Sequence, residues 1–361
     1  MSHENHIQFD TTKTDFIKDL RKQVNSYFKE NNLSKFYNGK MIYKAIFMLS
    51  LLFVPYFLII FNVFDFWLYN ILLWATMGFG MAGVGMGVMH DACHGAFSKN
   101  KTVNKILGYS INFVGGFDIN WRIQHNVLHH TYTNIIGADE DVDAGIILRF
   151  SDSQDKKKHH RYQHLYAWFL YGLMTISWVL TKDYVQLIKY NKKKLVKSQG
   201  VSLNKAIMLL TFWKVFYLLY ALILPIFLTG DIGISIAGFF LMHFVCGLFL
   251  TTIFLCAHIV DQTDFPIPDK NGEIKENWYA HQMKTTANFS NSRSIFSWFI
   301  GGLNYQIEHH LFPTICHIHY YELSKIVKKT AQEHGLPYHC NNTFLDALKH
   351  HYSHLKLMGS S

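Results

Sequence analysis

The sequence predicts an all-α integral membrane protein with four transmembrane helices and a cytoplasmic helical cap. Two observations support this fold class. Half of the 361 residues are hydrophobic and only 16% are charged, whereas soluble domains carry roughly 25% charged residues. The apolar residues also gather in four long blocks, at 45–63, 66–89, 206–229 and 232–257. Each block is about as long as the ~20 residues that a helix needs to cross a bilayer.

The basic residues indicate which ends of the blocks face the cytoplasm. The loop at 182–205 holds seven lysines and the first 42 residues hold seven lysines or arginines, whereas the short turns near Asp65 and Asp231 hold none. Positive residues favour the cytoplasmic side, so we expect a multi-pass protein of a bacterial inner membrane with its N-terminus and large loops inside. The net charge of +9 comes without an aromatic–basic binding motif. It therefore predicts contact with membrane lipids and no nucleic acid.

A fifth apolar stretch, at 166–180, complicates the count of spans. Its 15 residues are short for a span, and five spans would place the histidine clusters of the chain on opposite faces. We therefore interpret it as an interfacial helix. Lys214 is the one formally charged residue within the four blocks, and we expect it to extend toward the membrane surface. The glycines at 78–87 predict close packing between helices.

Composition divides the chain into three parts. Residues 1–44 have mixed charge, and an amphipathic pattern at 16–28 is expected to lie along the cytoplasmic surface. Residues 45–340 form the membrane domain, and residues 341–361 form a C-terminal tail. The five cysteines form no CxxC pair, which suits a reducing compartment.

Histidines form three clusters beside the predicted spans, and a further histidine stands where the fourth block ends. The clusters are HDACH (His90, His94), HNVLHH (His125, His129, His130) and QIEHH (Gln306, His309, His310), and the further residue is His258. A spacing of i, i+4 places two rings on one face of a helix, as in many metal sites. An ionisable group at membrane depth, such as His258, indicates a function.

Eight histidines are more than one metal ion can bind, so the pattern predicts two ions. The cysteines are not clustered, which argues against zinc-ribbon and iron–sulfur sites. Nitrogen-rich sites suit iron, copper or zinc. We favour iron, because a pair of irons can reduce dioxygen and abstract hydrogen from an unactivated carbon, which zinc cannot do. His243 lies too deep in the fourth block to be a ligand, and we expect it to make a polar contact in the helix bundle or in a substrate tunnel.

The segments HDACH, WRIQHNVLHHTYTN and GGLNYQIEHHLFP resemble the three histidine boxes of the membrane fatty acid desaturases, and the resemblance covers about residues 16–338. Gln306 and the following LFP are similar to the front-end class, which inserts a cis double bond between an existing one and the carboxyl end. The resemblance implies an O2-dependent oxidoreductase with a di-iron centre. It also implies that the irons are bound, at the reaction centre, by His90, His94, His125, His129, His130, His258, His309 and His310.

Two positions and one absent motif depart from the family pattern. Gln306 stands where related acyl-CoA desaturases have a histidine, so it is expected to contact a metal, hold a water or orient a neighbour. Phe254 stands where some relatives have an asparagine that holds a metal-bound water. The HPGG haem motif of fused cytochrome b5 domains does not occur. Electrons are therefore expected from a separate ferredoxin or cytochrome b5 with its reductase.

Charged residues near the clusters leave two questions open. Asp91, Glu308 and the acidic run at 139–143 are candidates to orient metal-bound rings, although such a run can equally be a solvated loop. Basic patches at 156–158 and 192–194 suit CoA phosphates or lipid headgroups, so both fatty acyl-CoA and acyl-lipid remain possible substrates. A membrane di-iron hydroxylase of alkyl or isoprenoid chains is the alternative function. A metal transporter is disfavoured, because the histidines cluster at the ends of the spans.

Overall fold

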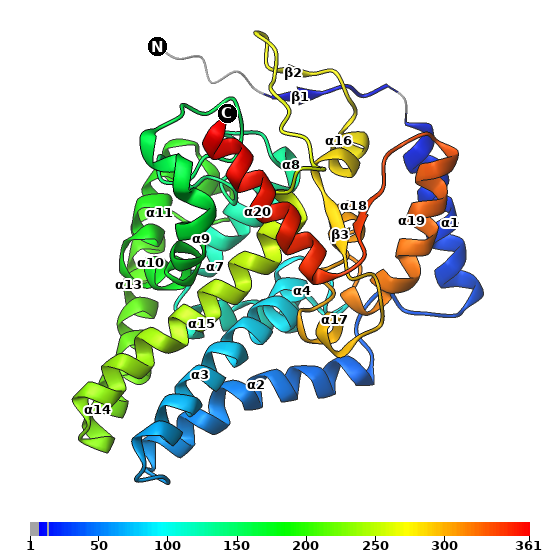
Figure 1. Ribbon diagram of the computed structural model, residues 1–361. Helices are drawn as coiled ribbons and strands as arrows, with labels where there is room; N and C mark the ends of the chain where they lie inside the picture. Colours follow the sequence, from blue (N-terminus) through cyan, green and yellow to red (C-terminus); the bar gives the residue numbers. More distant parts are fainter. Residues whose placement is uncertain (1–6, 13) are drawn as a thin grey trace.

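The computed structural model describes residues 7–12 and 14–361, which form a stalk of long helices below a broad helical cap (Figure 1). In this part of the chain, four helical segments are long and apolar enough to cross a membrane: Gly39–Ile60, Trp67–Cys93, Leu203–Thr229 and Ile232–His258. The predicted four-span fold is confirmed. The first and last segments begin after capping side chains, because Asn38 accepts a hydrogen bond from the amide of Met41 and Asp231 accepts one from that of Ile234.

Two of the spans contain a π-helical turn. The second span consists of α3 (Trp67–Val84), a π-turn at Gly85–Met89 and α4 (His90–Cys93), and the third consists of α13 (Leu203–Leu218), a π-turn at Leu219–Ile223 and α14 (Leu224–Thr229). Such π-turns are rare in proteins, and those that occur are frequently found at functional sites. The turn at Gly85–Met89 immediately precedes the first histidine cluster.

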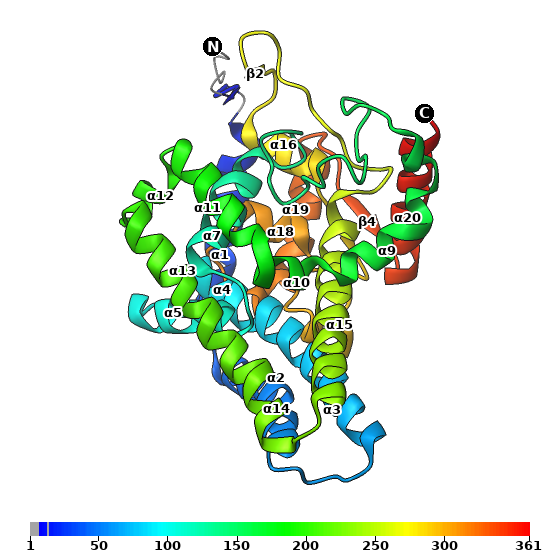
Figure 2. The ribbon, with the colours of Figure 1, turned by 90° about the vertical axis from the view of Figure 1, so that its left-hand side faces the viewer.

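The spans pack around α3, which contacts both α2 (Gly39–Ile60) and α15 (Ile232–His258) (Figure 2). Glycines allow this close approach, as expected. A methyl group on Gly80 would lie 2.6 Å from the backbone of Leu51 on α2, and one on Gly78 would lie 2.6 Å from the carbonyl oxygen of Met242 on α15. Side chains at these positions would separate the helices.

The amphipathic N-terminal helix buries its apolar face against protein. This helix, α1 (Asp15–Glu30), packs beside α19 (Tyr320–Glu333) at the edge of the cap (Figure 1). Phe16, Leu20 and Phe28 are buried in one cluster with Leu323 and Val327 of α19. The apolar stripe that suggested a surface helix is therefore part of the core of the cap.

The stretch at 166–180 does not form a span. It is broken into α9 (Gln163–Gly172), α10 (Met174–Ser177) and a π-turn at Trp178–Lys182, and α11 (Asp183–Lys192) follows. Of these pieces, α9 and α10 lie beside the upper part of α15 in the cap (Figure 2). Phe169 and Leu180 are exposed, which is consistent with the interfacial interpretation.

The expectation for Lys214 is wrong. Its side chain is buried, and its ammonium group donates a hydrogen bond to the carbonyl oxygen of Gly115 and forms an ion pair with the buried Asp183. The reason is that the loop at 114–118 and the start of α11 provide polar partners beside the third span. A buried lysine with such partners has no need to extend to water.

The last residues form a packed helix. In α20 (Phe344–Ser360), His351 donates from Nδ1 to the carbonyl oxygen of Ile259 at 2.6 Å, and its Nε2 accepts from the hydroxyl of Tyr171 at 2.8 Å. The segment therefore connects the end of the fourth span to α9. Two short parallel strand pairs brace the cap: β1 (Gln8–Phe9) with β2 (Glu273–Ile274), and β3 (Ala287–Phe289) with β4 (His339–Asn341).

Short helices complete the cap and carry most of the histidine clusters. The α-helical pieces are α5 (Lys101–Gly108), α6 (Ser110–Phe113), α7 (Asp118–Trp121), α8 (His130–Tyr132), α12 (Leu195–Ser198), α16 (Trp278–Thr285), α17 (Ile295–Phe299) and α18 (Gln306–Leu311). A fourth π-helical segment spans Arg122–His129, and 3-10 turns span Lys158–Tyr162 and His317–His319.

Candidate metal centre

The three histidine clusters and His258 meet at the junction between the stalk and the cap. Four elements bring them there. The second span ends at the first cluster, the π-helix at Arg122–His129 and α8 carry the second cluster, α15 ends at His258, and α18 carries the third cluster. All eight predicted histidines therefore lie in one region, although the chain positions run from 90 to 310.

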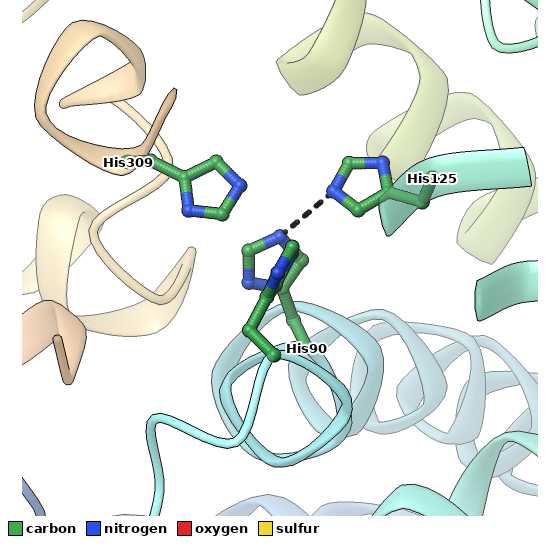
Figure 3. Close-up of side chains that lie close together, drawn as sticks. His90, His125 and His309 are labelled. Carbon is green, nitrogen blue, oxygen red and sulfur yellow. Dashed lines mark hydrogen bonds between the residues drawn. The ribbon is translucent and has the colours of Figure 1, made fainter. Parts of the chain in front are cut away.

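A first group of four histidines consists of His90, His94, His125 and His309, each with one ring nitrogen within 4.8 Å of the others. Figure 3 shows His90, His125 and His309 pointing toward one another from three separate elements. The Nε2 atoms of His90 and His125 are 3.3 Å apart. Such a cluster of imidazole nitrogens, brought together from distant segments, is suited to one metal ion.

A second group consists of His129, His258 and His310, and their donor atoms also lie within 4.8 Å of one another. Each ring uses Nδ1 for a hydrogen bond: His129 to Asp139 at 2.9 Å, His258 to the carbonyl oxygen of Thr285 at 3.3 Å, and His310 to the amide oxygen of Gln282 at 2.7 Å. These acceptors require the proton on Nδ1, which leaves a lone pair on Nε2.

The three Nε2 atoms of the second group are buried and have no hydrogen-bond partner among the described residues. Unpaired buried polar atoms are rare and need an explanation. Here three of them converge, each with its lone pair free. A metal ion coordinated by the three Nε2 atoms would satisfy all of them at once, so the residues fit the metal that the clusters imply.

His130 lies between the two groups. Its Nε2 is 2.9 Å from Nε2 of His309 in the first group, and its ring stacks on that of His310 in the second at a centroid distance of 4.4 Å. Its Nδ1 has no partner in the described part of the chain. The consecutive residues His129 and His130 thus face different parts of the site, and His125 and His129, one turn apart, belong to different groups.

Two carboxylates of the acidic run orient histidine rings. Asp141 accepts from Nδ1 of His125 at 2.7 Å, and Asp139 accepts from Nδ1 of His129. The side chain of Glu308 has other hydrogen-bond partners among the described residues, since it accepts from the side-chain amide of Asn288 at 2.7 Å and from the hydroxyl of Tyr338 at 3.0 Å. Asn288 in turn accepts from the amide of Ile307 at 2.9 Å, so Glu308 supports the backbone at the start of α18.

Sequence reasoning missed two further partners of the rings. Gln282 on α16 holds His310, and the hydroxyl of Tyr320 lies 3.2 Å from Nδ1 of His309. Tyr320 directly follows the histidine-containing segment at 317–319, but no sequence motif surrounds Gln282. Only its position in the folded chain reveals it.

Burial keeps most of these rings neutral, which is the form that binds metals. It lowers the pKa of His94, His130, His309 and His310 well below the ordinary value for histidine, and the neighbouring rings lower it further. Burial also lowers the pKa of His125 to about 4, although Asp141 acts in the opposite direction. For His129, burial lowers the pKa, but the Asp139 carboxylate more than compensates and the net shift is upward.

A cavity of about 540 Å³ adjoins the first group, and its size is typical of a ligand site. His90, His125 and Gln306 line its upper part, and its lining is mainly apolar. It descends between the spans to Met81 on α3 and Cys246 on α15. Met81 is nine residues before His90, which at ~1.5 Å per residue corresponds to about 13 Å of depth.

The two residues that depart from the family pattern both line this cavity. Gln306 is buried, and its Oε1 has no partner within the described residues. The ring of Phe254 packs against His129 and His258 at centroid distances of 5.0 and 4.9 Å. An apolar ring therefore occupies the side of the second group where an asparagine would have offered an amide.

The fold and the site define a helical membrane protein with two histidine groups suited to metal binding, beside an apolar cavity within its spans. The family model described as Fatty acid desaturase matches residues 65–342. The chain belongs to the fatty acid desaturase family.

Individual relatives narrow the class. The chain is 35% identical over 354 residues to the sn-1 linoleoyl-lipid 6-desaturase of Synechocystis sp., and the match covers 97% of both chains. It is 34% identical over 345 residues to the sn-1 linoleoyl-lipid 6-desaturase of Arthrospira platensis, covering 95% of this chain and 92% of the relative. The acyl-lipid (8-3)-desaturase of Physcomitrium patens is 34% identical over 365 residues, covering 97% and 73%. The protein is therefore a front-end fatty acid desaturase and an oxidoreductase, and the hydroxylase alternative is not favoured.

Proposed function

We propose that the eight histidines bind two iron ions and that the protein uses them, with dioxygen, to place a cis double bond at carbon 6 of a linoleoyl chain carried by a membrane lipid. The observation that carries the proposal is the convergence of three buried Nε2 atoms, each made a free acceptor by a partner on Nδ1, next to a second group of four histidines. His130, between the groups, is placed to complete either one.

Two irons held by these groups would supply dioxygen activation and hydrogen abstraction from the acyl chain. The protein's own residues position the two reactants. Asp139, Asp141 and Gln282 hold three rings in the tautomer and orientation that present Nε2. The cavity holds an alkyl chain beside His90 and His125, and its apolar walls exclude water from the reacting carbons.

The mouth of the cavity favours a lipid as the acyl carrier. The lining of the cavity includes one lysine, Lys182, and two aspartates, Asp141 and Asp143, and Asp143 and Ile147 are exposed. Lys189 is nearby, but its ammonium group pairs with Glu140 at 2.6 Å. Carboxylates disfavour the phosphates of CoA, whereas exposed Ile146 and Ile147 suit the surface of a bilayer. Two relatives are named for linoleoyl-lipid, which agrees with this carrier.

The orientation and the electron source follow from charge and stoichiometry. The lysine-rich loops would place the cap and the metal centre on the cytoplasmic side of a bacterial inner membrane. Reduction of dioxygen to two waters takes four electrons, and the substrate C–H bonds supply two. Ferredoxin or cytochrome b5 with its reductase would supply the other two. Turnover in isolated membranes should require an added donor, and turnover without one would refute this part of the proposal.

The decisive experiment combines metal analysis with lipid profiling. The purified protein should hold two irons per chain, and a host without polyunsaturated lipids should, when fed linoleate, accumulate a product with a new double bond at carbon 6. His130→Ala or His309→Ala should abolish the product while the protein still inserts. His334→Ala, a histidine at the exposed end of α19, is the matched control. A fully active His130→Ala or His309→Ala variant would show that the clusters are not the reaction centre.

The carrier is tested separately. Membranes supplied with linoleoyl-CoA or with linoleoyl phospholipid should give the product only from the lipid, with lipid remodelling blocked. Faster turnover of the CoA ester would show that CoA, and not a lipid, carries the acyl chain, and would leave the metal assignment unchanged.

A further inference from the structure

A buried chain of polar groups connects the first span to the metal centre. Lys44 lies on the apolar helix α2, yet its side chain is only 1% exposed. Its Nζ is 2.7 Å from Nε2 of His317, a residue 273 positions away in the chain. Nδ1 of His317 donates to Oδ2 of Asp91 at 2.8 Å, and the amide of His317 donates to the same oxygen at 3.2 Å.

These contacts indicate where the protons lie on Lys44, His317 and Asp91. The ammonium group of Lys44 can only donate, so Nε2 of His317 accepts and the proton of the neutral ring lies on Nδ1. That proton faces Asp91, which can only accept when it is ionised. A cation and an anion are thus joined through a neutral imidazole. Asp91, Cys316 and His317 could be mistaken for a third metal site, but both ring nitrogens of His317 are already engaged by Lys44 and Asp91.

The surrounding helices are shaped to hold the lysine. A methyl group on Gly87 of the π-turn would lie 2.9 Å from Cε of Lys44, so the absence of a side chain there provides the space. The ring of Trp298 lies 5.6 Å from Nζ on another side, at a distance where a cation is attracted to an aromatic face. A buried lysine is costly unless it is paired. Three separate segments, which carry Gly87, Trp298 and His317, provide the space and the partners for the buried ammonium group. The fold therefore accommodates Lys44 specifically.

Asp91, at the other end of this series of polar groups, lies beside a histidine of the first metal group. Asp91 follows His90 directly, and its Oδ1 lies 3.8 Å from Nδ1 of His90. That nitrogen has no hydrogen-bond partner in the described part of the structure. His125 and His309 of the same group have partners on Nδ1, in Asp141 and Tyr320. Asp91 is therefore the available orienting group for His90, provided that its carboxylate stays charged and in place.

We propose that Lys44 and His317 are positioning residues for the metal ligand His90, acting through Asp91. The inference rests on the proposed assignment of His90 as a ligand. Through His317, Lys44 holds the buried Asp91 in place, and His317 fixes which oxygen remains for His90. Removing the lysine would leave a buried carboxylate without its counter-ion. Asp91 would then be displaced, and His90 would lose its orienting partner.

The test is the binding of Co(II) by the apo-protein, followed by its visible absorption and by metal analysis. Lys44→Met should weaken one of the two binding steps by about 10- to 100-fold, which is the usual cost of losing an outer-shell partner, and leave the other step unchanged. Lys40→Met, an exposed lysine in the first turn of α2, is the matched control and should bind both ions like the unmodified protein. Gly87→Ala, which pushes on Lys44 without altering a polar group, should reproduce the selective loss.

A double-mutant cycle separates positioning from a general structural role. If Lys44 acts through His90, then Lys44→Met should have no further effect on Co(II) binding in a His90→Ala background. Equal weakening of both steps in Lys44→Met and Gly87→Ala, or an undiminished effect of Lys44→Met in the His90→Ala background, would overturn the inference. If the unmodified protein binds only one ion, the two-metal assignment fails, and a Lys44 effect that depends on His90 would still stand.

Discussion

Asp139 accepts a hydrogen bond from Nδ1 of His129 at 2.9 Å, and both side chains are fully buried. The same carboxylate accepts from the amide of Asn134 at 2.9 Å through Oδ2, and from the amide of Asp141 at 3.0 Å through Oδ1. Both of its oxygens therefore face N–H donors. The acidic run after the second cluster, which the sequence left open between a solvated loop and a partner of the metal site, is anchored at this residue.

Replacement of this carboxylate should damage the second metal group. Asn in place of Asp139 must turn its NH2 group toward one N–H donor whichever way the amide is oriented. We expect Asp139→Asn to lower metal affinity by about 10- to 100-fold, measured as iron content and Co(II) binding. Asp155→Asn, at an exposed side chain, should change neither. Full iron content in Asp139→Asn would show that the contact is not needed to orient His129.

Gln306 should affect turnover more than metal content. Its amide lines the cavity, and in the proposed assignment the eight histidines bind both metals without it. We therefore expect Gln306→Ala to keep most of the iron and lose much of the activity, because an unpaired Oε1 in the cavity is placed to orient a water or a neighbouring ring. Gln306→His should also keep its iron. If Gln306→Ala loses iron as completely as His309→Ala, then Gln306 is itself a ligand.

The depth of the cavity should limit the length of the acyl chain. Its lining ends at Cys246, one turn above His243, which is held between the hydroxyl of Tyr217 at 2.7 Å and that of Thr175 at 3.1 Å. A larger side chain at the floor, Cys246→Phe, should shift the preferred substrate to shorter chains in a host fed acids of graded length. Phe240→Ala, at an exposed position of α15, is the control. If an active Cys246→Phe variant keeps the same preference for chain length, the methyl end of the acyl chain does not lie at Cys246.

The four-span fold makes a topological prediction. Single cysteines placed at Asn100, Gln154 and Pro268, in a background without reactive native thiols, should react with an impermeant reagent only from the cytoplasmic side. A cysteine at Asp231, in the turn between the third and fourth spans, should react only from outside. Labelling of 154 and 268 from opposite sides would mean that the stretch at 166–180 crosses the membrane.

Much of the fold and most of the candidate site could be predicted from the sequence, because the signals are local. A span is set by the length of an apolar block, and the ends of the predicted blocks lie within six residues of the ends of the observed helices. Likewise, His90 and His94 are brought to one face of a helix by their i, i+4 spacing alone. For the stretch at 166–180, the sequence indicates only that it is too short to span the membrane. It does not predict where the helix is broken.

The sequence by itself thus determined the class of the protein, the number of spans and the eight histidines. Tertiary structure decided how these histidines are divided: His125 and His129 lie four residues apart, but His125 groups with His90, His94 and His309, whereas His129 groups with His258 and His310. It also decided the long-range contacts: Gln282 with His310, Asp183 with Lys214, and His317 with Lys44. Such pairs depend on how distant segments pack around a buried charge or ring, and no local pattern of residues specifies that packing.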